Sequence, residues 1–423
     1  MLASMMAAFR IPDLKKRIVF LFAMFAVYVV GLHISVPGVD TEVIRKNLSG
    51  GLFDIMDAFS GGAFKKYTIF AMGIMPYINA SIIMQLLTIA WPYLEELQKE
   101  GAAGQKKIRL YTRWMTGVMA LVQSWGMTAM LRQLGAVHAN GWELAQIVIT
   151  LVAGTAFLMW LGEQISDRGI GNGVSIIIFA GIVAFLPSEI LTTYAVIKTN
   201  NDWLAGIILL LLFVGTVTFI VAITQAQRKI PIQHVKRIVG NKMVGGQSSF
   251  LPLKVNSAGV IPIIFAVSIV NFPFTIAGFV SHGDNTHWFY RFANFISPSG
   301  SWVGALMYFL LIIFFTYFYT AVTFNVKDVS DNLKKWGSFI PGIRPGKPTQ
   351  EYLDKIMTRI TLAGAIFLAI IALMQYYVPV LTGIRTFSLV GGTSLLIVVG
   401  VALETMQAIE SHLLMRHYEG FIK

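Results

Sequence analysis

The sequence lacks cysteine altogether and is poor in charge, since Asp, Glu, Lys and Arg make up only 13% of its 423 residues. Without cysteine the chain forms no disulfide framework and offers no thiolate ligands to a metal, so cysteine redox chemistry is excluded as well. Apolar residues fill the composition instead: they account for 56% of the chain, with a mean hydropathy of +0.68. Soluble domains stay nearer to 45–50% apolar, so the sequence is that of an integral membrane protein.

Ten apolar runs are long enough, or nearly so, to cross a bilayer. The sequence therefore predicts an all-α, polytopic membrane protein with ten transmembrane helices. No small-x-small cleavage site follows the first run, which is interpreted as a retained span. The predicted spans are 18–33, 74–91, 114–131, 145–162, 174–187, 204–223, 258–280, 301–324, 360–380 and 387–407.

The positive charge predicts the orientation. Ten spans put both termini on one side, and the positive-inside rule favours a cytoplasmic location for them. With that choice only eight of the 33 Lys and Arg residues fall outside: Arg45, Lys46, Lys65, Lys66, Arg132, Lys198, Arg291 and Arg385. Most of the formal charge of +12 is therefore explained by topology, without nucleic-acid binding.

Residues 59–92 form a broken hydrophobic segment, in which a glycine-rich piece precedes an apolar helix that carries Pro76. Irregular backbone at membrane depth is tolerated only when it is buried in protein or faces an aqueous cavity. A pathway is therefore expected here. The sequence of this helix start, GIMPYI (73–78), has a counterpart in GVIPII (259–264).

A second pair of similar hexads, GVSIII (173–178) and GTSLLI (392–397), follows in the same order. The two pairs indicate an internal duplication of a five-span unit. Because five is odd, the second copy is inverted relative to the first, and the pathway is expected at the interface of the two halves. The predicted halves are residues 1–173 and 204–423, joined by a fifth span and hinge at 174–203.

Aliphatic residues in these hexads are candidates for a constriction. Ile78, Ile178, Ile264 and Ile397 occupy equivalent positions, while Ile74 and Val174 lie one helical turn before the first two. An isoleucine in a membrane helix most often faces lipid, but the repeat favours a shared position. A ring of such side chains would exclude water and ions by dewetting and would make no sequence-specific contact with a passing chain.

Ionisable residues are nearly absent from the predicted spans, where Glu404 is the only one. An ion-coupled carrier needs such groups at mid-span, so their scarcity argues against coupled transport. The neutral polar residues Asn79, Gln85, Thr88 and Gln123 are expected to join helices by hydrogen bonds, and some of these contacts could open and close.

Two long basic loops, 224–257 and 325–359, fall on the cytoplasmic side, and the first has no acidic residue. Basic charge near a membrane fixes topology or binds anionic lipid, but the length of these loops also favours a docking platform. GIRPGKPT (342–349) is not a nucleotide-binding loop, because Pro341 replaces the first glycine and no strand precedes it, so no direct nucleotide binding is expected.

Long motifs give the sequence a family resemblance that covers about Ile11 to Tyr418. FSGG (59–62), FAMGIMPYI (70–78), MWLGEQISDRGIGNG (159–173), LPLKVNSAGVIP (251–262), DNLKKWGSFIPGIRPGKPT (331–349) and FSLVGGTSLLIVV (387–399) resemble the bacterial SecY family. The resemblance implies a protein-conducting channel without enzymatic activity or cofactors. It also implies a clamshell of two halves with a plug at about 59–73 and a lateral gate between the second and seventh spans.

The resemblance also assigns residues to these parts. The pore ring falls on Ile74, Ile78, Val174, Ile178, Ile264 and Ile397, with valine at 174 in place of the more usual isoleucine. The plug includes Phe59, Ser60, Gly61, Gly62 and Phe64, and the lateral gate includes Gln85, Thr88, Gln123 and Asn256. Docking of the ribosome and of the SecA motor is expected at Arg228, Lys229, Lys236, Arg237, Arg344 and Lys347.

The expected partners are SecE and SecG subunits, SecA, the ribosome, signal peptides, nascent chains and anionic lipids, at the bacterial inner membrane. A secondary transporter of small solutes is the alternative, because it too would have inverted repeats and broken helices. A transporter would not need two large basic loops, and a purely structural scaffold would not need a plug.

Overall fold

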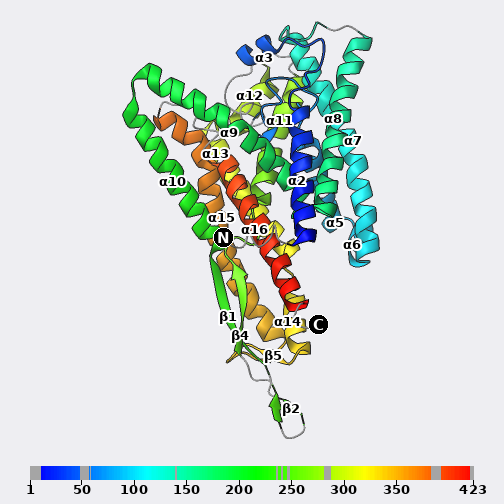
Figure 1. Ribbon diagram of the computed structural model, residues 1–423, viewed down its shortest axis with the longest axis vertical. Coiled ribbons are helices and arrows are strands. Elements are labelled where there is room, and N and C mark those ends of the chain that lie inside the picture. The colour runs from blue at the N-terminus through cyan, green and yellow to red at the C-terminus, as the bar shows by residue number, and fades with distance from the viewer. Residues whose placement is uncertain are drawn as a thin grey trace.

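The computed structural model of the protein describes residues 11–47, 57, 59–138, 141–234, 237–239, 242–244, 248–280, 287–382 and 392–419. Long helices run along one axis and form a bundle (Figure 1). A small sheet projects from one end of it, and the short helices α3 (Thr41–Asn47) and α12 (Trp288–Ile296) lie at the other.

In the described part of the chain, one long helix overlies each of the ten predicted spans. Six helical stretches are long and apolar enough to cross a membrane by themselves, and α5 and the described part of α11 are shorter apolar helices. The predicted class, an all-α polytopic membrane protein, is confirmed. The ten helices are α2 (Pro12–Gly31), α5 (Met75–Ala90), α7 (Ala102–Gln133), α8 (Trp142–Arg168), α9 (Gly173–Asn200), α10 (Trp203–Gln225), α11 (Ile261–Val280), α13 (Trp302–Thr323), α15 (Lys347–Thr382) and α16 (Thr393–Glu419).

Several helices are longer than the predicted spans. Helix α7 begins at Ala102 and α15 at Lys347, ahead of the apolar runs at 114 and 360. The added turns are polar and rich in Lys, Arg, Gln and Glu, which favour helix without favouring lipid. Hydropathy finds only the part of a helix that lipid surrounds. Two further short helices are α6 (Pro92–Lys99) and α14 (Val326–Lys335).

The first basic loop is not irregular: it forms most of the projecting sheet. Strands β1 (Gln227–His234) and β4 (Ser248–Lys254) pair antiparallel, and β5 (Ser338–Phe339), from the second basic loop, pairs with the other edge of β1. Ile230 and Ile232 alternate inwards and join a core with Leu253, Leu333 and Leu353. A second ribbon consists of β2 (Arg237–Val239) and β3 (Lys242–Val244).

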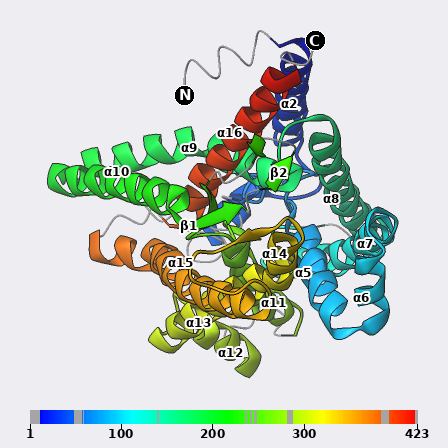
Figure 2. The same cartoon turned by 90° about the horizontal axis from the view of Figure 1, so that it is seen from below.

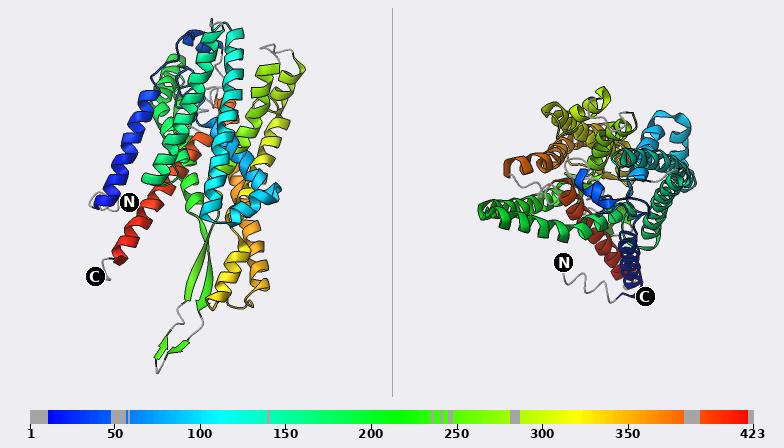
Figure 3. Two further views of the ribbon diagram at one scale, coloured as in Figure 1. Left: turned by 90° about the vertical axis from the view of Figure 1, so that its right-hand side faces the viewer. Right: turned by 90° about the horizontal axis from the view of Figure 1, so that it is seen from above.

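The two basic loops are also joined through one side chain. The imidazole of His234 lies 2.7 Å from the hydroxyl of Ser338 and 3.1 Å from that of Ser249, so it bridges all three strands. The sheet and α14 together form one protrusion at the end of the bundle, seen in the left view of Figure 3.

The two halves of the chain meet through a few helix pairs. Helix α11 of the second half contacts α5 and α7 of the first, and α16 contacts α9. Viewed from below, α7 and α8 lie on one side of the bundle and α13 and α15 on another (Figure 2). The largest buried apolar cluster includes residues of both halves, so the core of the molecule lies at their interface.

Candidate functional site

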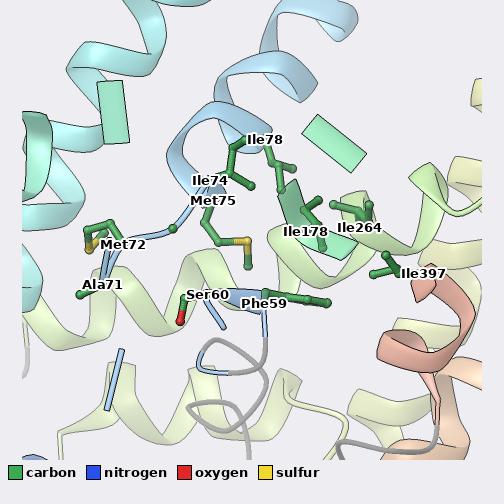
Figure 4. Close-up of a pocket in the computed structure, with 11 residues that line it drawn as sticks. Phe59, Ser60, Ala71, Met72, Ile74, Met75, Ile78, Ile178, Ile264 and Ile397 are labelled. Carbon is green, nitrogen blue, oxygen red and sulfur yellow. The ribbon is translucent and has the colours of Figure 1, made fainter. Parts of the chain in front are cut away.

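A narrow apolar waist lies where the four hexads meet. Its cavity measures about 10 Å³, which is room for about one water molecule. Figure 4 shows Ile78, Ile178, Ile264 and Ile397 gathered around one small volume from separate helices, with Met75 and Phe59 beside them. Five of the six predicted ring residues line this cavity: Ile74, Ile78, Ile178, Ile264 and Ile397. Each of the five is less than 8% exposed, so the waist is closed in this structure.

The first pair of hexads reaches the waist through the same local geometry. Gly73 and Gly259 both have positive φ angles, +55° and +64°, which let the chain turn sharply into α5 and α11. A proline follows in the first helical turn of each, where its missing N–H costs no hydrogen bond. Ile78 and Ile264 therefore occupy matching places at the start of two helices.

The second pair supplies Ile178 of α9 and Ile397 of α16, close to the first turn of each helix. Asn172 caps the N-terminus of helix α9, because its side chain accepts hydrogen bonds from the backbone N–H groups of Val174 and Ser175. Helix α16 begins after Gly392, whose φ is +87°. Four helix starts from two halves thus converge on one small volume.

Val174 does not line the waist cavity, whereas Ile74 does. The reason is direction. Helices α5 and α9 approach the waist from opposite sides. Ile74, one turn before Ile78, therefore lies on one side of the constriction, and Val174, one turn before Ile178, lies on the other. Ile74 accordingly faces the plug segment, and the half-buried Val174 faces a polar vestibule. The position of Ile74 and Val174 one turn before Ile78 and Ile178 thus puts them on opposite sides of the constriction.

Two methionines at the waist were missed by the sequence analysis. Met75 lies beside the isoleucines and Phe59, whereas Met72 borders the cavity and points away towards Ala71, in the neighbouring cluster with Phe64. Thioether side chains are unbranched and flexible and fill irregular gaps. The hexad comparison could not find them, because Met72 precedes the hexad and Met75 corresponds to Ile261 in GVIPII.

The predicted plug residues form a compact turn on one side of the waist. Gly61 and Gly62 both have positive φ, +72° and +80°. The Tyr28 hydroxyl of α2 donates a hydrogen bond to the Ser60 carbonyl oxygen at 3.2 Å. A Cβ on Gly61 would lie 3.0 Å from the Cα of Gly181 in α9. The turn is therefore packed directly against two transmembrane helices.

Asp57 stabilises the same turn by accepting hydrogen bonds from two of its backbone N–H groups. Its side chain accepts a hydrogen bond from the Lys65 backbone at 2.9 Å, and its carbonyl accepts from Gly62 at 2.8 Å. The Lys65 ammonium lies 3.9 Å from the Asp57 carboxylate, which explains how this lysine is accommodated. Nearby, burial raises the pKa of the Tyr67 phenol to about 12, so this side chain stays neutral.

A polar vestibule of about 320 Å³ lies on the other side of the waist. Ile78, Ile178 and Ile264 form its floor and are shared with the waist cavity. Arg113 of α7 and Glu163 of α8 form a bidentate ion pair at its wall, with N–O distances of 2.7 and 2.6 Å. The remaining polar wall includes Ser81, Gln85, Arg109, Ser166, Asp167 and Asn172.

The predicted gate residues are only partly brought together. Gln85 faces the vestibule and hydrogen-bonds Ser81 on its own helix, and the Thr88 hydroxyl bonds to carbonyls of α5. Gln123 is buried on α7, the neighbour of α11. Asn256 precedes α11, and its Cα lies 3.7 Å from where a Cβ on Gly364 of α15 would be.

Asn256 therefore packs against α15, on the side of its own half. Buried polar residues that α11 itself carries were missed by the sequence analysis, namely Ser268 and Asn271. They lie in an otherwise apolar helix that contacts both α5 and α7. Two polar residues within an apolar run are the sequence feature from which they could have been predicted.

The predicted docking residues are distributed over the protrusion. Arg228 and Lys229 are exposed on β1, and Arg344 and Lys347 are exposed on the turn before α15 and at its start. Arg237 begins β2, and Lys236 lies outside the described residues. The turn is fixed by the Thr349 hydroxyl, which donates to the Arg344 carbonyl at 2.8 Å.

An acidic side chain also lies buried in the fifth helix, α9. Glu404 is not the only ionisable residue in the membrane-length helices, because α9 extends to Asn200 and contains Glu189, which is 8% exposed. The predicted fifth span ends at Pro187 or extends towards Ile197, and the longer of these agrees with α9, which continues through this proline to Asn200. Among the described residues, no group of three His, Asp or Glu side chains could hold a metal ion.

Comparison with known proteins agrees with this geometry. The SecY family profile matches residues 68–406. The chain belongs to the SecY family. It is 44% identical to protein translocase subunit SecY of Streptomyces galbus, with 100% of both chains covered, and 43% identical to that of Pseudomonas aeruginosa, with 98% and 94% covered.

Solved structures of SecY-family and related channels share the fold at low identity. A structure described as a protein conducting channel superposes with a TM-score of 0.69 at 19% identity, covering 94% of this chain and 92% of that one. Sec61 in the canine ribosome–channel complex from the endoplasmic reticulum gives a TM-score of 0.66 at 17% identity, with the same coverage.

Proposed function

We propose that this SecY-family chain is the protein-conducting channel subunit of a translocase. The observation that carries the proposal is the closed waist: five isoleucines from four helices of two halves meet between a packed turn and a polar vestibule. A polypeptide would enter the vestibule in unfolded form, displace the plug turn and thread through the waist.

The waist suits a passing polypeptide of any sequence. Aliphatic side chains offer it no hydrogen bonds, and at rest they exclude water and ions by dewetting. The flexible side chain of Met75 would let the same constriction adapt to side chains of different size. The site contains no arrangement of nucleophile, base and electrophile, and the chain is proposed to be a channel and not an enzyme, so that the energy for movement comes from partners.

Lateral release is proposed at the seam where α11 meets α5 and α7. The chain would act as a clamshell, with residues 1–173 and 204–423 as its halves and 174–203 as the hinge. A sufficiently apolar segment held at this seam would partition into lipid, since each Leu or Ile gains about 0.3–0.6 kcal/mol at the bilayer centre. Gln85, Thr88 and Gln123 would face the seam, while Asn256 would act at its base.

The protrusion is the proposed docking platform for the ribosome and for SecA, through Arg228, Lys229, Arg344 and Lys347, together with Lys236 and Arg237. Relatives of this chain are named protein translocase subunits, and one structural neighbour is described in a ribosome–channel complex. SecE and SecG are the proposed companion subunits. The positive-inside rule supports a cytoplasmic location of both termini, and the bacterial origin of the relatives supports the inner membrane as the location.

The alternative function, transport of small solutes, is not supported by the relatives or by the waist cavity. Relatives that match the whole chain are translocase subunits. The cavity at the waist is also too small and too apolar to bind a polar solute, because it is lined almost entirely by aliphatic, thioether and aromatic groups.

A double substitution tests the seal. Ile78→Gly with Ile264→Gly should raise ion conductance of vesicles that contain the assembled translocase, because it removes two side chains from the constriction, while export of a precursor persists. Leu306→Gly with Leu310→Gly on the exposed face of α13 is the control, since these leucines are 45% and 55% exposed. Unchanged conductance in the first variant would argue against the ring.

A further inference from the structure

Helix α12 has three distinct faces, which follow from the 100° rotation per residue of an α-helix. Trp288, Phe292 and Phe295 fall on one face within about 60° of each other. All three are exposed, by 69%, 48% and 50%. Large aromatic side chains gathered on one face of a nine-residue helix need a non-aqueous environment.

The other two faces have different surroundings. Ala293 is fully buried, and Phe289 and Ile296 beside it are half-buried, so this side packs on the bundle, where α12 contacts α11 and α13. Arg291 and Asn294 form an exposed polar edge on the opposite flank of the aromatic face. Going round the helix, protein-facing, aromatic and polar sectors follow one another.

The helix is rigidly joined to α13. The Ser301 hydroxyl donates to the Phe295 carbonyl at 2.6 Å and accepts from the Gly304 N–H at 2.9 Å. A Cβ on Gly300 would lie 1.9 Å from the Asn294 carbonyl oxygen, and one on Gly304 would lie 2.3 Å from that of Ser297. The corner can close this tightly only with glycine at both positions, so α12 and α13 keep a fixed angle.

The aromatic face lies beside an exposed apolar surface of the membrane-length helix α13. On α13, Trp302, Leu306, Leu310 and Phe314 are spaced at one-turn intervals and are 73%, 45%, 55% and 57% exposed. In the end-on view, α12 and α13 lie together at the rim of the bundle (Figure 2), and α12 sits at the end opposite the sheet (Figure 1).

We propose that α12 is an interfacial anchor that lies in the headgroup region of the bilayer, with Trp288, Phe292 and Phe295 in the acyl boundary and Arg291 and Asn294 at the water side. Aromatic side chains with a basic residue at the polar edge are typical of helices that lie in a membrane interface. Because the corner with α13 is rigid and α12 also contacts α11, lipid would fix the depth of the α11–α13 hairpin.

The absence of cysteine makes the test direct, since an introduced cysteine is the only thiol in the chain. Phe292→Cys and Asn294→Cys would each be labelled with an environment-sensitive fluorophore in the full chain, within the translocase complex, in phosphatidylglycerol–phosphatidylethanolamine vesicles. We expect blue-shifted emission that nitroxide-labelled lipid quenches at position 292. At position 294 we expect red-shifted emission that aqueous iodide quenches.

Phe289→Cys is the matched reference for a side chain packed on the protein, and its label should resist both quenchers. Iodide quenching at 292 equal to that at 294 would mean that the face is in water, and protection of 292 from both quenchers would mean that a protein covers it. Either result overturns the anchor. With the proposed orientation, in which both termini are cytoplasmic, α12 would lie in the outer leaflet. Iodide added to one side of the membrane only tests this location separately from lipid contact.

Discussion

At the scale of single residues, the Tyr28 hydroxyl joins the plug turn to the transmembrane helix α2 by one hydrogen bond. It is buried and donates to the Ser60 carbonyl, while its ring stacks on Phe70 with centroids 5.8 Å apart. Tyr28→Phe keeps the stacking and removes the hydrogen bond, which is worth about 0.5–1.5 kcal/mol. We expect the resting open probability in planar bilayers to rise roughly twofold to tenfold.

Tyr308→Phe is the matched control for that substitution. Tyr308 is also fully buried in a transmembrane helix, but its hydroxyl has no hydrogen-bond partner among the described residues. Its removal should leave the open probability unchanged. An equal rise in both variants would show that loss of a buried hydroxyl loosens the bundle in general, and that the plug contact is not responsible.

Individual waist residues could be predicted because the duplicated hexads mark equivalent positions twice. Ile78 and Ile264 were found this way, and both follow a positive-φ glycine and a first-turn proline. Met75 and Tyr28 could not be found. Met75 corresponds to Ile261 in the other hexad, so the two hexads share no residue there. Tyr28 acts on a segment 32 residues away, so its role depends on a contact that only the folded chain contains.

At the scale of elements, the plug turn depends on glycine for two reasons that can be separated. Gly61 and Gly38 have similar φ angles, +72° and +81°. Only at Gly61 would a Cβ meet another element, the backbone of Gly181, whereas no described atom lies within 4 Å of the Cβ position at Gly38. Alanine at either site costs about 1–2 kcal/mol of backbone strain.

Gly61→Ala should therefore push the turn off α9 and raise ion leak through vesicles, while Gly38→Ala should lower thermal stability with no change in leak. Leak and melting temperature would be measured for both variants. If Gly38→Ala leaked as much as Gly61→Ala, backbone strain alone would explain the effect, and the packing of the turn on α9 would not be needed.

The positions of the helices were predicted well and the projecting sheet was not. Twenty apolar residues in succession have few alternatives in lipid, so α10, α11 and α13 begin and end close to their predicted spans. The β1 strand has only Ile230 and Ile232 facing inwards, and its partner β5 comes from a loop 104 residues further on. Pairing at that distance leaves no periodic signal within either loop.

At the scale of the whole molecule, the two halves touch through α5, α7 and α9 on one side and α11 and α16 on the other. A clamshell that releases segments sideways must open at the contacts of α11 with α5 and α7. The hydrogen bonds of Gln85 and Thr88 in this structure are made within α5 itself, so these bonds do not have to break when α5 and α11 separate.

A cross-link between α5 and α11 should keep the seam closed and stop both export and lateral release. Gln85→Cys on α5 and Phe265→Cys on α11 place two thiols on the wall of one vestibule, and a short bifunctional thiol reagent would join them in an otherwise cysteine-free chain. We expect the cross-link to block export of a secreted precursor and insertion of a membrane segment, and cleavage of the reagent to restore both.

Tyr317→Cys with Thr358→Cys is the control, because the Tyr317 hydroxyl donates to the Thr358 carbonyl within one half at 2.9 Å. Full export through the cross-linked Gln85–Phe265 pair would mean that the halves do not separate at α5 and α11, and the lateral gate would have to lie elsewhere.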